Sequence, residues 1–233
     1  MNDTKNIPIH ISIIPDGNRR WAKARGFMAS YGHVKSGDYK HIRSLVSEAK
    51  EQGTKYLSLW ALSTENWSRP KGEREVIFKL VMNTIDNIRK DISKNKIKFK
   101  FRFVGRKDRL PKNLVSEISK LEKETKNFKD FTVILCLDYG GRDEILRAIN
   151  KMIKSGIKNV NEVKFSNFLD TSNIPDVDLI IRTAGEQRTS GFMPFQSVYS
   201  ELYFTKTSFP DFQRKDLRKA IEDFAKRKRN FGR

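Results

Sequence analysis

Cysteine is nearly absent from this chain, because among its 233 residues only Cys136 occurs, inside the apolar run FTVILCLDYG. A disulfide within the chain is therefore excluded, as is a zinc site built from thiolates. No apolar run approaches the ~18 residues that a membrane-spanning helix needs. The N-terminal segment MNDTKNIPIH also lacks the charged-then-apolar pattern of a secretory signal. We therefore expect a cytoplasmic protein in which Cys136 is a buried structural thiol.

Several common signatures are missing as well. The chain contains neither GxxxxGK[ST] nor GxGxxG, which disfavours a P-loop NTPase and a dinucleotide-binding enzyme. It has no internal repeat, no low-complexity linker and no composition shift that would mark a domain boundary. Its length suits one α/β core. We therefore expect a single domain over residues 1–233, with a basic C-terminal tail at about 226–233.

Negative charge is scarce relative to positive charge. Lysine and arginine number 47 against 28 acidic residues, which gives a formal net charge of +19. Such an excess indicates an anionic partner, which could be a nucleic acid, a membrane surface or a phosphorylated substrate. The simpler interpretation of most of these lysines is a solvated surface.

What the chain does contain is an alternation of strand and helix patterns. Strands are predicted at residues 10–15, 56–63, 98–105, 131–140, 178–185 and 201–206. Helices are predicted at residues 32–53, 74–94, 111–127, 142–156 and 214–228. This order predicts an α/β fold with a central, mostly parallel sheet that helices cover on both faces.

Polar loops follow four of the predicted strands. They are the segments 16–20 (DGNRR), 63–69 (STENWSR), 139–142 (YGGR) and 182–190 (RTAGEQRTS). Because ligands bind at the carboxyl ends of strands in open α/β sheets, we expect these loops to converge on one rim. Glycine turns and arginine forks suit phosphate oxygens. The arginines fall into two sets, which predicts two phosphorylated groups or one large polyanion.

A carboxylate among these arginines, Asp16, would repel phosphates unless a cation lies between them. Mg²⁺ is typically held by one or two carboxylates together with substrate phosphates, so Asp16 is a candidate ligand. Simpler interpretations remain open at this point. Asp16 could cap a turn, His33 and the tryptophans Trp21 and Trp67 could be packing residues, and the apolar stripe at 74–94 could be ordinary core.

Taken together, these segments closely resemble the cis-prenyltransferase family, also known as the undecaprenyl-diphosphate synthase family. The matching segments are HISIIPDGNRRWAKARG, YGHVKSG, LSLWALSTENWSRP, DYGGRDEI, DLIIRTAGEQRTSGFMPFQSVYSELYF and FPDF. They occur in the family's order and cover residue 10 to about residue 212. Several separate motifs in one order are far more specific than any single motif.

The resemblance implies a homodimer that condenses isopentenyl diphosphate onto an allylic diphosphate, with Mg²⁺ as cofactor. It implies that Asp16 and Glu201 bind the metal and that Asn66 is the proton-acceptor position. The allylic pocket would contain Gly17, Asn18, Arg19, Arg20 and His33. The second loop would contribute Ser63, Glu65, Trp67 and Arg69, and isopentenyl diphosphate would lie at Arg182, Arg188 and Ser190. Trp21, Thr64 and Thr189 complete the implied substrate-binding set, and the 74–94 helix would line the product tunnel.

The chain also departs from the family pattern. Arg19 stands where many members have glycine, and Ala29 stands where many have an arginine, so Arg19 could compensate for Ala29. Ala184 replaces the second glycine of an RTGGE pattern, and Asn230 replaces an arginine of the C-terminal RRFG pattern. None of these changes removes an implied metal ligand or catalytic residue.

Two alternative functions remain open, and a contact with membrane could accompany the enzymatic function. A basic nucleic-acid-binding protein would use the segments 98–109 and 226–233, whose phenylalanines could stack on bases; we do not expect nucleic acid, since those rings alternate like strand core. A non-catalytic partner subunit of a cis-prenyltransferase is the other alternative. The positive surface could also hold the enzyme peripherally on anionic membrane.

Overall fold

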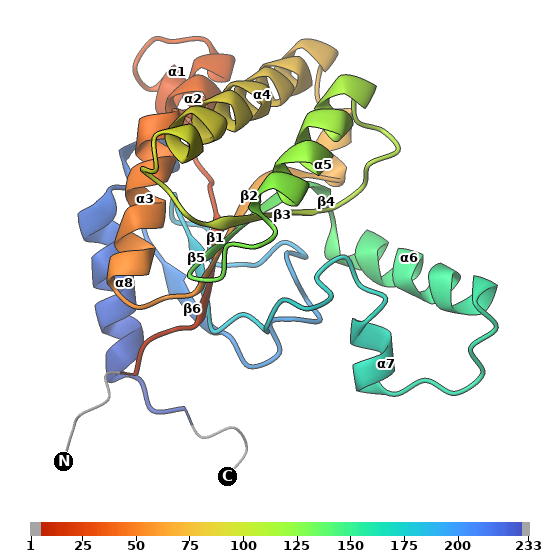
Figure 1. Cartoon of the computed structure of the whole chain (residues 1–233). Helices are drawn as coiled ribbons and strands as arrows, with labels where there is room; N and C mark the ends of the chain where they lie inside the picture. Colours follow the sequence, from red (N-terminus) through yellow and green to blue (C-terminus); the bar gives the residue numbers. More distant parts are fainter. Residues whose placement is uncertain (1–5, 230–233) are drawn as a thin grey trace.

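The computed structural model describes residues 6–229, and its centre is a six-stranded parallel sheet in the order β3-β4-β2-β1-β5-β6 (Figure 1). The strands are β1 (His10–Ile14), β2 (Tyr56–Ser63), β3 (Lys100–Val104), β4 (Thr132–Tyr139), β5 (Leu179–Arg182) and β6 (Glu201–Phe204). Strands such as β1 and β5 are buried along their whole length, as expected where both faces of a parallel sheet are covered. The predicted α/β class is confirmed.

The helices follow the predicted order, with two additions, α1 and α7, and one predicted helix that is divided in two. They are α1 (Asn18–Lys23), α2 (Ala29–Ser36), α3 (Tyr39–Glu51), α4 (Lys71–Ser93), α5 (Lys112–Thr125), α6 (Gly141–Lys154), α7 (Glu162–Ser166) and α8 (Arg214–Lys226), with short 3₁₀ turns at Glu65–Ser68 and Phe209–Asp211. The predicted helix 32–53 is two helices, because Asp38 caps a new one by accepting a hydrogen bond from His41 N at 3.0 Å.

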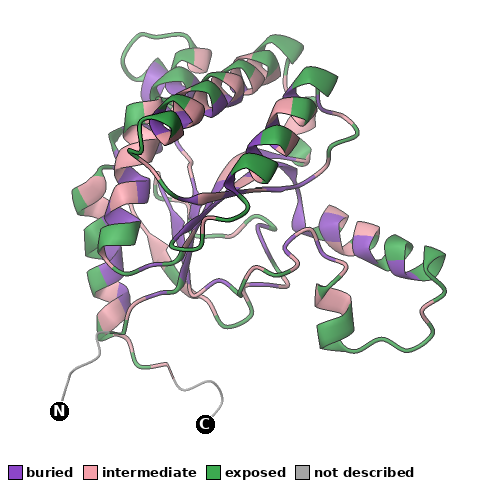
Figure 2. Ribbon diagram, viewed as in Figure 1, coloured by how far each residue is buried: buried purple, intermediate pink, exposed green. Residues whose placement is uncertain are grey.

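One face of the sheet carries the main hydrophobic core. The helices α3, α4, α5 and α8 cover this face, and their buried stripes are purple in Figure 2. On α4 the buried residues include Ile77, Val81, Ile85 and Ile88 at helical spacing, as the apolar stripe predicts. Many of the remaining core residues come from alternate positions of the strands, for example Ile11 and Ile13 of β1.

The other face differs from the prediction that helices cover both faces of the sheet. Its smaller core combines strand residues with Val177, Phe192 and Met193 of the irregular segments that precede and follow β5. Phe192 stacks on Trp60 of β2 with ring centroids 4.6 Å apart. Helices α6 and α7 extend away from the sheet instead of lying flat on it (Figure 1). Consequently several apolar residues of α6, among them Leu146 and Ile153, are exposed.

The basic–aromatic run at 98–105 contains β3, one of the two edge strands of the sheet. Phe101 and Phe103 are buried in the main core, whereas the alternating residues Lys100 and Arg102 are half-buried. Arg102 lies 3.9 Å from Glu122 of α5. These rings are therefore not exposed for stacking on bases, which does not favour the nucleic-acid alternative. Within residues 6–229, no helix combines the length and the apolar character needed to cross a membrane.

Candidate active site

The carboxyl ends of β1, β2 and β5 and the N-terminus of α6 surround a polar pocket with a volume of about 740 Å³. The four polar loops predicted to meet at one rim all contribute to its wall. The predicted site residues that line it are Asp16, Gly17, Asn18, Arg19, Arg20, His33, Ser63, Glu65, Asn66, Arg69, Arg182 and Ser190. Cationic side chains outnumber acidic ones, so the pocket suits an anionic ligand.

The turn after β1 depends on Gly17. This residue has a φ of +90° and is the N-cap of α1, a conformation that residues with a Cβ rarely adopt. A Cβ at this position would lie 2.5 Å from the Cβ of Ala184, so the loops after β1 and β5 touch here. Gly17 N also donates a hydrogen bond to Asp16 Oδ1 at 2.6 Å. The turn therefore fixes the first loop against the loop after β5.

The arginines explain why a carboxylate stands at the mouth of β1. Asp16 Oδ2 accepts a hydrogen bond from Arg182 Nη2 at 2.8 Å, and Oδ1 lies 3.8 Å from Arg20. Its backbone N–H donates to Thr183 Oγ1 at 2.8 Å. The side chain of Asp16 is nevertheless 29% exposed, so part of the carboxylate faces the pocket. Asp16 can therefore organise the arginines and contact a bound cation at the same time.

Arg182 connects the first loop to the loop after β5. Its side chain is only 7% exposed. Besides Asp16, it donates through Nη1 to Ser190 Oγ at 2.7 Å and to the backbone oxygen of Arg188 at 2.6 Å. The guanidinium thus holds Asp16 and Ser190 in a fixed relation. Arg188 itself pairs with Glu186 at 2.6 Å and is largely exposed beside the pocket.

His33 also lines the pocket, and it is held by Glu73, a residue that the sequence analysis did not single out. Its Nε2 lies 3.1 Å from Oε1 of Glu73, in the first turn of α4, and Arg69 pairs with the same oxygen at 3.0 Å. Burial lowers the pKa of His33, and the positive charges of Arg69 and Arg19 lower it further, although Glu73 opposes them. His33 is therefore neutral at pH 7 and can donate one hydrogen bond and accept another.

In the second loop, Ser63 and Asn66 hold each other. Asn66 N donates to Ser63 Oγ at 3.2 Å, and Ser63 N donates to Asn66 Oδ1 at 3.4 Å. Trp67 does not line the pocket, and two guanidinium groups, those of Arg74 and Arg109, lie over its ring at 4.7 and 4.5 Å from the ring centre. The two cations and the ring fix the loop that carries Asn66.

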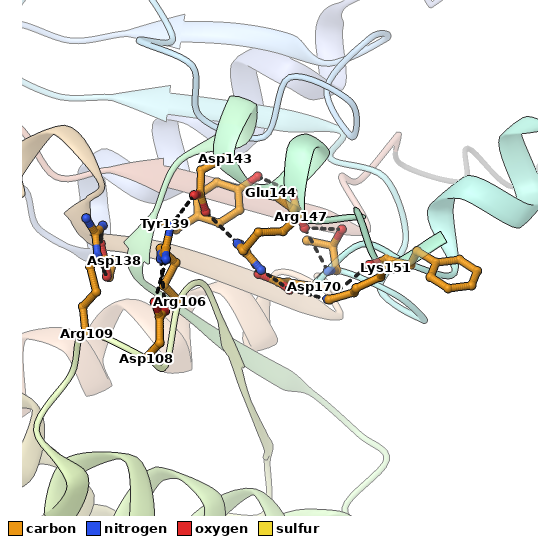
Figure 3. A network of polar contacts seen from close by, with 12 residues as sticks. Arg106, Asp108, Arg109, Asp138, Tyr139, Asp143, Glu144, Arg147, Lys151 and Asp170 are labelled. Carbon is orange, nitrogen blue, oxygen red and sulfur yellow. Dashed lines mark hydrogen bonds and ion pairs between the residues drawn. The ribbon is translucent and has the colours of Figure 1, made fainter. Parts of the chain in front are cut away.

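Arg109 is in turn fixed by a polar network beside the pocket, shown in Figure 3. Its guanidinium bonds to both carboxylate oxygens of Asp138, which is fully buried at the end of β4. In the same view Arg147 pairs with Asp143 and Asp170, and Tyr139 donates to Glu144 at 2.7 Å. These bonds hold the start of α6, and with it the YGGR turn, at the edge of the pocket.

Some implied residues lie elsewhere. Trp21 donates through Nε1 to Asp211 Oδ2 at 2.7 Å and stacks on Phe27, so its packing interpretation is supported. Glu201 is the first residue of β6, whereas the pocket lies at the carboxyl ends of the strands. It pairs with Arg227 at 2.7 Å, and the structure does not bring it to Asp16. Trp67, Thr64, Arg188 and Thr189 are neighbours of the pocket but do not line it.

Other pocket residues were not predicted as ligands. Arg142 and Lys23 line the pocket, and neither has an ion pair among the described residues. Gly141 N donates to the oxygen of Gly191 at 3.1 Å, which places Arg142 next to the loop of Ser190. The YGGR motif was the signal for Arg142, since it ends a strand at the same rim. Residues 230–233, which include Asn230 of the tail pattern, lie outside the described residues.

The residues present fit a single Mg²⁺ that substrate phosphates help to hold. No group of three or more His, Cys, Asp or Glu side chains that could hold a metal occurs within residues 6–229. Asp16 supplies one carboxylate, and Asn18 Oδ1 is a buried oxygen without a hydrogen-bond partner in the described chain. Because Mg²⁺ keeps several waters and needs only one or two carboxylates beside phosphates, this donor set is sufficient.

A second, apolar cavity of about 150 Å³ adjoins the polar pocket and shares Pro15, Asn18, His33, Trp60 and Ala61 with it. Beyond these residues it runs between the sheet and the helices α3 and α4. Its apolar lining comprises Ile42, Val46, Leu59, Ile77, Leu80, Val81, Ile85, Ile88, Phe99, Phe101, Val133, Ile134, Leu135 and Phe209. The site therefore suits a ligand with an anionic head and an apolar tail.

Comparisons with known proteins agree with this geometry. A family model described as "Putative undecaprenyl diphosphate synthase" matches residues 14–232. The isoprenyl transferase of Fusobacterium nucleatum is 48% identical over 98% of this chain and 97% of its own length, and that of Aquifex pyrophilus is 47% identical over 97% and 96%.

Solved structures are similar over almost the whole chain as well. One is lavandulyl diphosphate synthase from Lavandula x intermedia in complex with dimethylallyl diphosphate, with a TM-score of 0.91, 35% identity and coverage of 97% of this chain and 99% of that one. Another is a probable undecaprenyl diphosphate synthase from Campylobacter jejuni, with a TM-score of 0.81, 32% identity and coverage of 98% and 100%.

Proposed function

The chain belongs to the undecaprenyl diphosphate synthase family, and we propose that its reaction takes place where the polar pocket meets the apolar cavity. It is a prenyltransferase that condenses isopentenyl diphosphate onto an allylic diphosphate with cis geometry at the new double bond. We place the reaction there because the polar pocket and the apolar cavity adjoin each other. Both substrates and the product have a diphosphate head and an apolar tail, and the two spaces share His33 and Asn18.

In this proposal each diphosphate has its own set of residues. The allylic diphosphate is bound by Asp16, Gly17, Asn18, Arg19, Arg20 and His33. Isopentenyl diphosphate is bound by Arg182, Arg188, Thr189 and Ser190, with Ser63, Glu65 and Arg69 between the two. The 2.8 Å bond between Arg182 and Asp16 supports this division, since it places the two sets in contact. Bound in this way, the reacting carbons of the two substrates face each other.

The pocket residues then stabilise the charge that the reaction creates. When the allylic carbon–oxygen bond breaks, its electrons go to the diphosphate, where Arg19 and Arg20 stabilise the added negative charge. The isopentenyl double bond attacks the allylic carbon and forms the new carbon–carbon bond. The isopentenyl unit then loses a proton, which leaves the new cis double bond. Because an amide is a poor base, Asn66 orients a diphosphate oxygen that accepts this proton. When bound, Mg²⁺ supplies further positive charge to the leaving diphosphate.

The cofactor and the membrane contact belong to the proposal too. We assign Mg²⁺ to Asp16, with Asn18 Oδ1 beside it, because hard oxygen donors suit this ion. Within one chain Glu201 bonds to Arg227 and lies away from the pocket, so its metal role stays a prediction that rests on the resemblance. A peripheral contact with anionic membrane stays a prediction that rests on the net charge of +19. The non-catalytic alternative is not favoured, because Asp16 and Asn66 are both present at the pocket.

The activity is tested with labelled isopentenyl diphosphate and allylic primers of ten, fifteen and twenty carbons, with and without Mg²⁺. We expect a ladder of cis-polyprenyl diphosphates that disappears when EDTA removes the metal and returns when Mg²⁺ is restored. Equal incorporation with EDTA would contradict the assigned cofactor. No incorporation with any primer would contradict the function itself.

A homodimer is supported by the exposed apolar face of α6. Leu146, Ile149 and Ile153 are 60%, 41% and 67% exposed, and Val160 and Val163 near α7 are exposed as well. Monomeric proteins rarely leave such a contiguous apolar surface in water. We expect the wild-type protein to be a dimer by light scattering after size-exclusion chromatography, and the double variant Leu146→Asp/Ile153→Asp to be a monomer.

The matched control for this experiment is Asn113→Asp, which adds a negative charge at an exposed polar position of another helix, α5. This variant should stay dimeric. A double variant that keeps the wild-type mass would show that α6 is not the interface.

A further inference from the structure

The wall of the apolar cavity contains one polar cluster that the proposed reaction does not use. Tyr39 and Arg43, both on α3, line the cavity, and both contact Asp91 near the end of α4. Tyr39 Oη donates to Asp91 Oδ2 at 2.7 Å, and Arg43 Nη1 lies 3.0 Å from the same oxygen. Asp91 is only 9% exposed. A nearly buried carboxylate beside an apolar cavity is costly unless it is paired, as it is here.

The position of Asp91 on α4 shows where along the cavity this cluster lies. Ile77, Val81, Ile85 and Ile88 form the buried stripe of α4, and Asp91 is the next buried residue of the helix. The stripe begins one turn after Glu73, which contacts His33 at the polar pocket. At about 1.5 Å of rise per residue, roughly 27 Å of helix separate Glu73 from Asp91. The cluster therefore lies at the end of the stripe that is remote from the diphosphate site.

The cluster also joins the two helices between which the cavity runs. Ile42 and Val46 of α3 and the stripe of α4 face the cavity from two sides. Tyr39 and Arg43, on the same helix as Ile42, reach across to Asp91 and connect α3 to α4 at this point. The Arg43 side chain is 37% exposed, so the cluster separates the apolar cavity from water.

Growth of an apolar chain is favourable along the cavity and becomes unfavourable where the chain reaches this cluster. Each added prenyl unit gains about 0.8 kcal/mol per buried CH₂-sized group while it contacts apolar walls. Contact with Arg43 and Asp91 instead removes water from charged groups, which is unfavourable. The Tyr39 hydroxyl stays protonated and keeps its bond to Asp91, because burial and Asp91 raise its pKa above the usual range.

We propose that Tyr39, Arg43 and Asp91 form a polar end wall of the product tunnel and set the chain length at which elongation stops. This inference rests on the proposed function of the site. It assigns the product length to the distance between the diphosphate pocket and the Asp91 carboxylate. The three residues are specificity-determining and take no part in the chemical step.

The test compares product ladders at saturating isopentenyl diphosphate. The variants are Asp91→Leu, the paired apolar replacement Arg43→Leu/Asp91→Leu, and Tyr39→Phe, which removes only the hydroxyl group. We expect the dominant product to lengthen by one or more prenyl units in the two leucine variants and the distribution to broaden toward longer chains in Tyr39→Phe. The rate of the first condensation should stay within about twofold of wild type, because the first product does not reach the wall.

The matched control is Arg89→Ala, which removes an ion pair of the same helix to Glu117 of α5, on a side that does not line the cavity. Its ladder should equal that of wild type. An unchanged or shortened ladder in all folded cluster variants would overturn the inference, and Tyr39→Phe decides the question alone if the leucine variants do not fold. Failure of the proposed function is distinguishable, because the wild-type protein would then yield no ladder.

Discussion

Replacing Asp16 with asparagine is expected to lower kcat about a hundredfold to a thousandfold, the range seen when one preorganised electrostatic group is removed from an active site. Asparagine has nearly the same shape and can still accept the bond from Gly17 N. What it lacks is the charge that holds a cation against the diphosphate and balances Arg182 and Arg20. The measurement is steady-state incorporation of labelled isopentenyl diphosphate as a function of Mg²⁺ concentration.

The structure indicates that this variant remains folded, since Arg182 keeps its bonds to Ser190 and to the backbone oxygen of Arg188. The Mg²⁺ concentration for half-maximal rate should rise in Asp16→Asn, because a neutral amide is a weaker ligand. The control is Asp211→Asn, a carboxylate that bonds to Trp21 and Arg25 outside the pocket. Wild-type kinetics in Asp16→Asn, with unchanged Mg²⁺ dependence, would exclude the assigned role.

The sequence predicted the rim because the rule that governs it is topological. Parallel strands place their carboxyl ends at one edge, so the loops at 16–20, 63–69, 139–142 and 182–190 were expected to meet, and their residues line one pocket. The α4 stripe was predictable for the same kind of reason, since its spacing alone defines a buried face. These features depend on periodicity and order, which a single sequence contains.

The hydrogen-bond and ion-pair partners of individual side chains were not predictable, because no local sequence pattern encodes contacts between distant residues. Trp21 follows two arginines and looks like part of a binding loop, yet its partner is Asp211, far along the chain. Glu73 was not singled out, although it holds both His33 and Arg69. Glu201 was placed at the metal by resemblance, and only the register of β6 shows that it starts the strand instead of ending it.

The break between α2 and α3, within the predicted helix 32–53, had a local signal in the sequence. The apolar pattern across the segment concealed this signal. Gly37-Asp38 interrupts the helix, and Asp38 caps the next one. The segment that packs on the second face of the sheet had no comparable signal in the sequence. Its residues, such as Phe192 and Met193, come from an irregular segment without periodicity, so its packing followed only from the folded chain.

The largest expected effect on stability comes from Glu48, on the side of α3 that faces α8. Its side chain is fully buried and bonds to Arg218 at 2.7 Å, to Arg214 at 2.9 Å and to Gln52 at 2.9 Å. Removing one partner of a buried ion pair costs about 3–5 kcal/mol. Because Arg214 and Arg218 are about half-exposed and water screens them, we expect a smaller loss for Glu48→Gln, about 2–3 kcal/mol.

The measurements are urea unfolding and the Tm, which should fall by roughly 5–10 °C for a loss of this size. The control is Glu75→Gln, which removes an exposed carboxylate 3.7 Å from Lys71. A surface pair of this kind contributes about 0–1 kcal/mol, so this variant should unfold close to wild type. Equal stability of the two variants would show that the α3–α8 pair contributes no more than a surface contact.

The pH dependence separates the charge of Glu48 from its packing. The bonds from Arg218, together with those from Gln52 and Arg214, lower the pKa of Glu48 from 4.5 to about 2. The folded state therefore binds the proton less readily than the unfolded state, and the stabilisation is complete above pH 4.5 and lost as the pH falls toward 2. The stability difference between wild type and Glu48→Gln should shrink over this interval. A difference that stays constant from pH 6 to pH 3 would mean that shape, and not charge, holds α3 in place beside the product tunnel.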